Sequence, residues 1–249
     1  PAINACLNQP KGLAFNNNGD LFIADQFSQV IRKVDRDGFI STFAGRAGLS
    51  GYSGDGGPAP NARLSFPIGL AVNNEGELLI ADTSNGRIRK VDNGGIISTL
   101  VQFSYPSYLS VQRNGELLVS HASGITRIDA NGLEIPMVSE SNDYNYDKIN
   151  DGNSFNNGEL FIPENVPFAF VSSVSFLSDS LLVASDTYHH EIKTVDLKGN
   201  VIRTIAGNNQ GSIENDGRPL DVKLNFPRGV TVVNQEIYVA DFGNHCIRK

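Results

Sequence analysis

The sequence predicts an all-β fold, a β-propeller built of four-stranded antiparallel blades. Two observations predict it: the 249-residue chain repeats itself, and the repeated unit of about 40 residues has the length of one propeller blade. Each unit holds apolar runs of four to six residues, rich in Val, Ile, Leu and Phe, which is typical of strands and too short for helices. No window of the chain shows a sustained helical period.

The opening strand of the repeat has the pattern Leu-x-x-Pro-x-Gly followed by apolar residues. It covers residues 7–15, 64–72 and 224–232, and two degenerate copies begin near Pro106 and Val171. The five anchor positions are 57, 39, 65 and 56 residues apart. The longer spacings contain inserts between the fourth strand of one repeat and the first strand of the next, so we expect five blades separated by connections of unequal length.

Turns separate the other strands of the repeat. The second strand ends in Ala-Asp at residues 24–25, 81–82 and 240–241, and the third strand carries Ile-Arg-Lys at residues 31–33, 88–90 and 247–249. Pairs such as Asn18–Gly19 and Asn93–Gly94 tolerate positive φ and form tight hairpins. Each repeat therefore predicts an antiparallel meander, and the last repeat is incomplete because it stops at Lys249, before a fourth strand.

Composition excludes several classes of partner. The formal net charge is −7, from 20 basic and 27 acidic residues, so the chain lacks the positive surface that nucleic-acid binding requires. No apolar run is long enough for a membrane span, so we expect neither nucleic-acid binding nor direct membrane insertion. We also expect no cofactor.

Motifs in this chain resemble those of the NHL-repeat family. They are Pro227–Arg–Gly229 in the last opening strand and residues 240–249, which read Ala-Asp-Phe-Gly-Asn-His-Cys-Ile-Arg-Lys; residues 51–59 are similar to an inter-blade segment of the family. The resemblance covers nearly the whole chain and implies a β-propeller, a fold that hosts many unrelated functions. The third and fourth repeats depart from the pattern, with Ser120–His121 in place of Ala-Asp and Ser173 in place of the opening-strand Gly.

Residues 1–249 are expected to form a single propeller domain that is a fragment of a longer protein. The last repeat lacks a fourth strand, and the first residues match the middle of an inter-blade segment. A closed ring needs a strand from the other end of the chain, which leaves the edge at Ile247 to be covered by residues outside this range or by another chain.

Recurrent carboxylates are the first candidates for a site. Asp25, Asp82, Asp186 and Asp241 each precede a basic residue by seven positions. Repetition once per blade favours an ionic contact within each blade over a metal site, because a catalytic or metal site needs different residues from different blades. The four histidines offer no set of three or four converging zinc ligands, so we expect no metal centre.

Five residues are predicted to contribute to binding. Asp55, Asp151 and Asp216 lie in acidic, Gly-containing loops, and Asn244 and His245 lie in the turn after the last Ala-Asp. Calcium binding by residues 147–158 is disfavoured, because Ile149 and Gly158 stand where oxygen ligands are required. In an up-and-down blade the inserts 45–61, 139–157 and 207–219 emerge on the same side as the turns 82–86 and 241–245. Long loops on a rigid scaffold commonly carry function.

The two cysteines leave two alternatives open. Cys6 and Cys246 stand at positions that are polar in other repeats, and a disulfide between the first and last blades would imply an oxidising compartment. The other alternative is a pair of unrelated thiols, as expected if a further blade separates them.

The function predicted is that of a non-enzymatic propeller that binds another protein, or is a structural module, in a secreted or cell-surface protein. Contact through the insert-bearing side or the open blade edge, with a partner protein or with another copy, is expected. The alternative is an enzyme similar to propeller lactonases or amidating lyases, with a divalent metal in the central channel; no catalytic residue is assigned.

Overall fold

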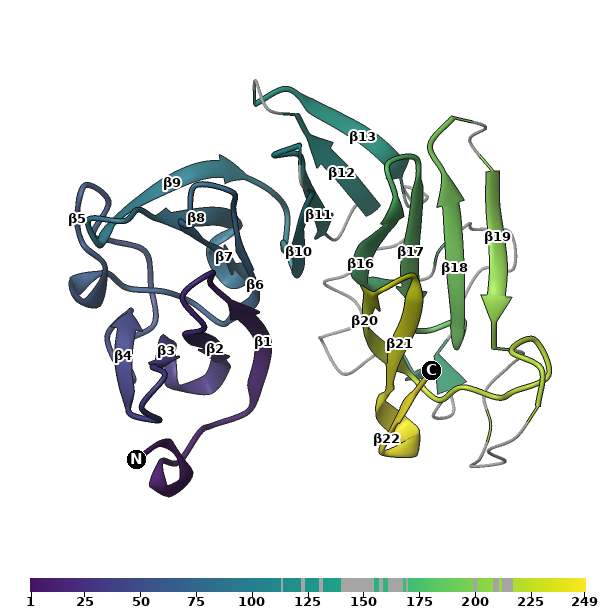
Figure 1. The fold of residues 1–249 in the computed structure, drawn as a ribbon, viewed down its shortest axis with the longest axis horizontal. Coiled ribbons are helices and arrows are strands. Elements are labelled where there is room, and N and C mark those ends of the chain that lie inside the picture. The colour runs from purple at the N-terminus through teal and green to yellow at the C-terminus, as the bar shows by residue number, and fades with distance from the viewer. Residues whose placement is uncertain are drawn as a thin grey trace. The chain divides into compact units, whose positions relative to one another are not determined.

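The structure is a computed structural model of the chain. It describes residues 1–112, 114–121, 124–129, 132–139, 155–156, 159–160, 168, 170–198, 201–207, 211 and 217–249. These residues form antiparallel sheets joined by tight turns and short 3₁₀ helices (Figure 1). The predicted all-β propeller of small antiparallel sheets is confirmed.

Three sheets come from the first 139 residues. The first has the order β1 (Pro10–Phe15), β2 (Leu21–Asp25), β3 (Val30–Val34), β4 (Ile40–Ala44). The second has the order β5 (Gly57–Pro58), β9 (Ile96–Gln102), β8 (Arg87–Val91), β7 (Leu78–Asp82), β6 (Pro67–Val72). The third has the order β10 (Tyr108–Val111), β11 (Leu117–His121), β12 (Gly124–Ile128), β13 (Glu134–Ser139).

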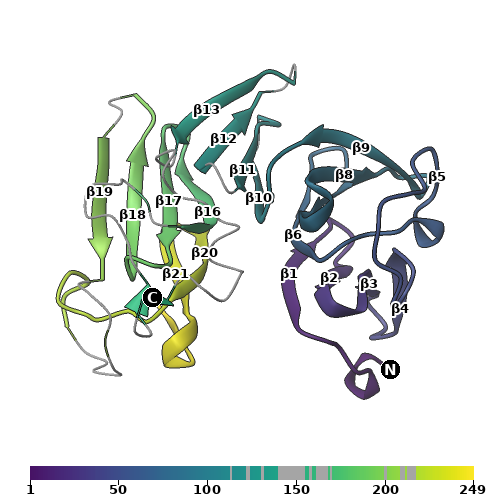
Figure 2. The same cartoon turned by 180° about the vertical axis from the view of Figure 1, so that it is seen from behind.

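Two further sheets follow a two-stranded hairpin of β14 (Phe155–Asn156) and β15 (Glu159–Leu160). The fourth has the order β16 (Val171–Ser178), β17 (Leu181–Asp186), β18 (Glu191–Asp196), β19 (Val201–Ala206), which Figure 2 shows side by side. The fifth has β20 (Pro227–Val233), β21 (Glu236–Asp241) and β22 (Cys246–Arg248). Within this sheet β22 is an edge strand, and Ile247 is 70% exposed on it.

The second sheet has five strands, one more than the sequence predicts. The extra strand β5 comes from the insert between the first and second repeats, where Gly57 pairs with Ile97 and Pro58 with Ile96. It was missed because a Gly-Pro pair has no apolar alternation and Pro is rare within strands. The insert therefore covers the outer edge of the second blade.

The hairpins between third and fourth strands share one side-chain cap. The Asp92 carboxylate accepts the backbone N–H groups of Gly94 and Ile96, both at 2.9 Å. Asp35 caps the first sheet's hairpin in the same way, accepting from Asp37 and Phe39. An aspartate that bonds its own turn favours the turn over extended strand, which fixes where each meander reverses.

The chain has two compact units. Unit 1 comprises residues 1–121 and 128–133, and unit 2 comprises residues 122–127 and 134–249. In unit 1 the opening strands β1, β6 and β10 lie side by side, and in unit 2 β16 lies beside β20. The order of these strands follows the order of the repeats.

Close approach of neighbouring opening strands explains the glycine of the Pro-x-Gly motif. A methyl group on Gly12 would overlap the carbonyl oxygen of Ile68, and one on Gly69 would lie 2.9 Å from the Cα of Tyr108. Ser173 takes the glycine's place in β16, where its hydroxyl accepts the N–H of Val230 at 3.1 Å. The fourth repeat's departure from the motif is thus accommodated by a hydrogen bond to the next blade.

Apolar side chains fill the space between adjacent sheets. The core between the first and second sheets includes Ile31, Leu64, Ile80 and Ile97, all fully buried. A second cluster joins the second and third sheets, and a third cluster joins the fourth and fifth. The imperfect apolar alternation in the sequence follows from this burial on both faces.

Replacing Gly69 with alanine is expected to destabilise unit 1 by about 3 kcal/mol, because the new methyl group overpacks against backbone that cannot rotate away. Urea unfolding followed by circular dichroism measures the loss. Gly57→Ala is the matched control, since its methyl group meets only the Gly54 carbonyl oxygen at 3.4 Å. Equal losses in the two variants would contradict the close-approach explanation.

Candidate functional site

A buried aspartate ends the second strand of four blades. Its Oδ1 accepts a backbone N–H from the loop that leads into the same blade's opening strand. The donors are Asn8 to Asp25 (2.6 Å), Ser65 to Asp82 (2.7 Å), Phe170 to Asp186 (3.4 Å) and Asn225 to Asp241 (2.7 Å). Each carboxylate is at most 1% exposed. The carboxylate therefore fixes the connection between blades at the point where the chain enters the aspartate's own sheet.

In three of these four blades, Oδ2 of the aspartate binds the Arg or Lys side chain that lies seven residues later in the sequence. The pairs are Arg89–Asp82 at 3.3 Å, Lys193–Asp186 at 2.5 Å and Arg248–Asp241 at 2.6 Å. The predicted ionic contact within each blade is confirmed for these three. It is wrong for the first blade, where Arg32 donates to the Ser41 carbonyl oxygen and Asp25 Oδ2 is buried without a partner.

Burial and pairing shift the pKa of these carboxyl groups in different directions. Burial raises the pKa of Asp82 and outweighs the bonds from Asn85, Ser65 and Arg89. Burial also opposes ionisation of Asp186, but the bonds and charges of His189 and Lys193 hold its pKa below the ordinary value. In the third blade, burial lowers the pKa of His121, which stands in the aspartate's place, to about 4.

Asp55 lies in the insert of unit 1, and its carboxylate forms hydrogen bonds with other side chains of the same chain. Its carboxylate accepts hydrogen bonds from the hydroxyls of Tyr52 and Thr99, both at 2.7 Å, and from Arg89 at 2.5 Å. Burial opposes its ionisation, but these donors keep the pKa of Asp55 below its ordinary value. The Arg89 guanidinium, which is fully buried, thus joins the insert to the second blade.

The other predicted binding residues differ in their accessibility. Asn244 is buried and donates to Asp241 at 2.8 Å, so its amide is used within the fifth blade. His245 is exposed at the end of the same turn, with a left-handed φ of 56°. Asp151 and Asp216 lie outside the described residues.

Each blade has one end that carries the turn between its second and third strands, and we call this end the turn edge. It comprises the turns 26–29, 83–86, 187–190 and 242–245 and the residues that lead into the opening strands. In unit 1 the insert 45–61 contacts this edge: Asn85 donates to the Gly51 carbonyl at 2.8 Å, and Gly48 donates to the Ser28 carbonyl at 3.0 Å. The prediction that insert and turns share one side is confirmed in unit 1.

Each unit has exposed aromatic side chains at its turn edges. Phe27 is 44% exposed, Tyr105 38%, Phe242 52%, and Tyr52 of the insert 47%. The Arg228 guanidinium lies over the Phe242 ring, 4.2 Å from its centroid. Sequence reasoning missed these residues because an aromatic in a β-rich chain is expected in the core; Phe242, beside the predicted Asn244 and His245, was the available signal.

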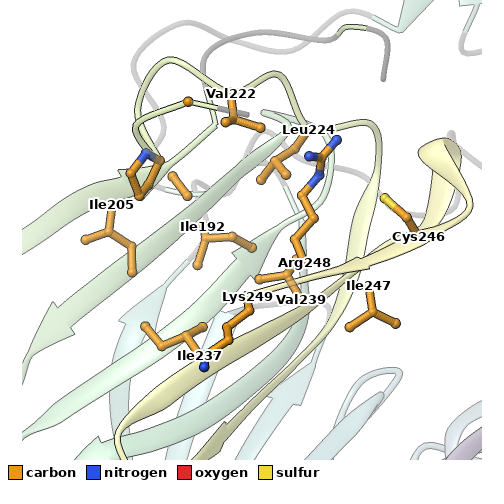
Figure 3. Close-up of a pocket in the computed structure, with 13 residues that line it drawn as sticks. Ile192, Ile205, Val222, Leu224, Ile237, Val239, Cys246, Ile247, Arg248 and Lys249 are labelled. Atoms are coloured by element: carbon orange, nitrogen blue, oxygen red, sulfur yellow. The ribbon is translucent and has the colours of Figure 1, made fainter. Parts of the chain in front are cut away.

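A groove of about 650 Å³ lies between the fourth and fifth sheets in unit 2. Figure 3 shows Ile192, Leu224 and Val239 among its apolar lining residues. Their counterparts in unit 1, Ile31, Leu64 and Ile80, belong to the core between the first and second sheets, where Val91 and Ile97 are also buried. The groove therefore has the lining of an inter-blade core rather than that of a catalytic pocket.

Among the described residues, no group of three or more His, Cys, Asp and Glu side chains has the arrangement of a metal site. Cys6 is exposed, Cys246 is half-buried, and both are free thiols. They belong to different units, and the two alternatives, a disulfide bridge or two unrelated thiols, both stay predictions.

Replacing Asp55 with alanine is expected to lower stability by about 3 kcal/mol, because the buried Arg89 loses a charged partner. The urea midpoint measures the change. Asp37→Ala, which removes an exposed carboxylate from a hairpin in the same unit, is expected to change stability by less than about 0.5 kcal/mol. An Asp55→Ala variant as stable as the parent chain would contradict the claim that the pairing of Asp55 with Arg89 stabilises the fold.

Family models match two parts of this chain. The model described as "Teneurin NHL domain" matches residues 1–53 and 48–109, and the model described as "NHL repeat" matches residues 224–249. These ranges contain the repeats in which the Pro-x-Gly and Ala-Asp motifs are complete.

Two curated relatives illustrate the similarity. NHL repeat-containing protein 2 of Gallus gallus is 44% identical over 72 residues, which are 29% of this chain and 10% of that protein. Teneurin-1 of Mus musculus is 31% identical over 102 residues, which cover 36% of this chain and 4% of that protein. The matches thus span a small part of much longer proteins.

Solved structures show the same fold. An auxiliary nutrient binding protein from Bacteroides thetaiotaomicron has a TM-score of 0.71 at 12% identity, with 98% of this chain and 59% of that chain covered. A gluconolactonase from Xanthomonas campestris has a TM-score of 0.63 at 14% identity, with 94% of this chain and 70% of that chain covered. In the part of this chain that the structure describes, no helix is both long enough and apolar enough to cross a membrane.

Proposed function

The chain is an NHL-repeat β-propeller protein, and from this premise we propose that it is a non-enzymatic module that binds another protein along the turn edges of its blades. The observation that carries the proposal is the set of exposed aromatics there, of which Phe27 and Phe242 are 44% and 52% exposed. Aromatic and arginine side chains supply most of the binding energy in protein interfaces. Phe242 together with Arg228 has this composition.

The scaffold supports the same proposal. The turns that hold Phe27 and Phe242 follow the buried Asp25 and Asp241, whose hydrogen bonds fix the loops beside them. A side chain on a rigid turn loses little further freedom on binding, which favours affinity. The exposed His245 lies in the same turn as Phe242, and we propose that it contributes to binding. Asp151 and Asp216, outside the described residues, stay predictions as binding residues.

The open edge of β22 offers a second route, either to a partner or to another copy of the chain. Ile247 is 70% exposed there, and an edge strand presents unpaired backbone groups that accept a further strand. We propose the turn edges as the main surface because they carry exposed aromatic side chains in both units, and Arg228 beside Phe242 in unit 2.

A secreted or cell-surface location completes the proposal. Its support is the match of residues 1–109 to the Teneurin NHL domain model and the 31% identity to teneurin-1. The gluconolactonase structure supports the fold alone, since its identity to this chain is 14%.

Capture of cell-surface proteins by the immobilised chain, quantified by mass spectrometry, tests the surface. We expect Phe27→Ala/Phe242→Ala to lower the recovery of the specific partner at least tenfold, as the loss of two interface anchors predicts. The matched control is Phe15→Ala/Phe39→Ala, which removes two exposed phenylalanines from the opposite, hairpin ends of the first sheet.

Each outcome has a defined meaning. Loss with the control variant and not with the turn-edge variant would refute the turn-edge proposal. Loss only with Ile247→Lys, which places a charge on the edge strand, would assign binding to β22 instead.

A further inference from the structure

The last residue of two turns holds the next blade through its side chain. In unit 1, Gln29 Oε1 accepts the backbone N–H of Phe66 at 2.7 Å. In unit 2, His190 Nδ1 accepts the backbone N–H of Phe226 at 3.0 Å. Gln29 and His190 have the same left-handed conformation, with φ of 63° and 60°, and both are buried. The two contacts therefore join successive blades at equivalent positions, one through an amide oxygen and the other through an imidazole nitrogen.

Protonation affects these two junctions differently. A neutral imidazole accepts at Nδ1 only when its proton is on Nε2, and the imidazolium form has no acceptor. Protonated His190 would place an N–H against the N–H of Phe226 in a buried site beside the Phe226 ring, whose centroid is 4.6 Å from that of the imidazole. The amide of Gln29 does not titrate, so its junction with Phe66 is independent of pH.

The charged groups that face His190 come from three elements. Asp186 at the end of β17 and Asp241 at the end of β21 favour the imidazolium, whereas His189 in the same turn disfavours it. Both carboxylates are already paired, Asp186 with Lys193 and Asp241 with Arg248. Burial is the largest effect, and the pKa of His190 lies below its ordinary value.

We propose that His190 makes the junction between the fourth and fifth blades acid-sensitive, while the corresponding junction of unit 1 is not. Loss of the Phe226 contact removes one of the hydrogen bonds that hold the loop entering β20, next to the turn that carries Phe242. Because the pKa of His190 is lower in the folded chain than in the unfolded chain, the contribution of the neutral side chain to stability is complete above the unfolded pKa near 6.5 and is lost as pH falls from there through the folded pKa. The inference goes beyond the proposed function and holds whether or not a partner binds at the turn edges.

Hydrogen exchange of the full chain at pH 7 and pH 5, corrected for intrinsic rates and read by mass spectrometry, tests it. Peptides containing Phe226 are expected to exchange roughly tenfold faster at pH 5 than at pH 7, because opening of the junction lets His190 take up a proton at its ordinary pKa near 6.5, and this favours the open state as pH falls. Peptides containing Phe66 are expected to keep the same corrected rate. Equal behaviour of the two junctions in the native chain would overturn the proposal.

Three variants separate His190 from its neighbours. His190→Gln copies the chemistry of Gln29 and is expected to abolish the acid effect at Phe226, and Gln29→His is expected to transfer it to Phe66. His189→Asn places there the residue found at Asn85 and Asn244; it should keep the acid effect at Phe226 and move it to higher pH, because it removes a group that disfavours the imidazolium form of His190. An acid effect that survives in His190→Gln, or disappears in His189→Asn, would refute the assignment; where a variant does not fold, the comparison within the native chain still decides.

Discussion

A buried carboxylate at the end of the second strand is the interaction on which the blades depend. Through one oxygen it holds the loop that enters its own opening strand, and in three blades its other oxygen binds a base from the third strand. A charge this deeply buried is tolerated only when paired and hydrogen-bonded. The constraint therefore recurs in four blades, of which the first lacks the base and leaves Asp25 Oδ2 without a partner. The third blade has His121 in the aspartate's place.

The same buried aspartates also fix the turns that form the turn edges. The 3₁₀ turns η2 (Gln26–Ser28) and η5 (Phe242–Asn244) begin directly after Asp25 and Asp241, so Phe27 and Phe242 stand on anchored backbone. The fixed turns also bring Gln29 and His190 against the following blade. The fixed turns therefore position both the proposed binding surface and the contacts between blades. This shared position links the proposed protein contact to the acid sensitivity of unit 2.

Much of the fold could be predicted, because strand length, turn pairs and the Pro-x-Gly motif are local signals that recur. The exceptions have tertiary causes. Strand β5 exists only because its two residues meet the edge of β9, and Asp55 is bound by Arg89 from 34 positions away. The ionic pairs followed from their spacing of seven residues, yet the same spacing failed for Arg32. The contact of His190 with Phe226 depends on how two blades meet, which no spacing encodes.

A double-mutant cycle on Asp82 and Arg89 is the most direct test of the claim that buried carboxylate pairs hold the blades. Unfolding free energies of Asp82→Ala, Arg89→Ala and the double variant give the coupling between the two side chains. We expect a coupling of about 2 kcal/mol or more, the range seen for residues that share a buried network. A coupling near zero would show that the blade is held by its apolar core alone and would contradict the account.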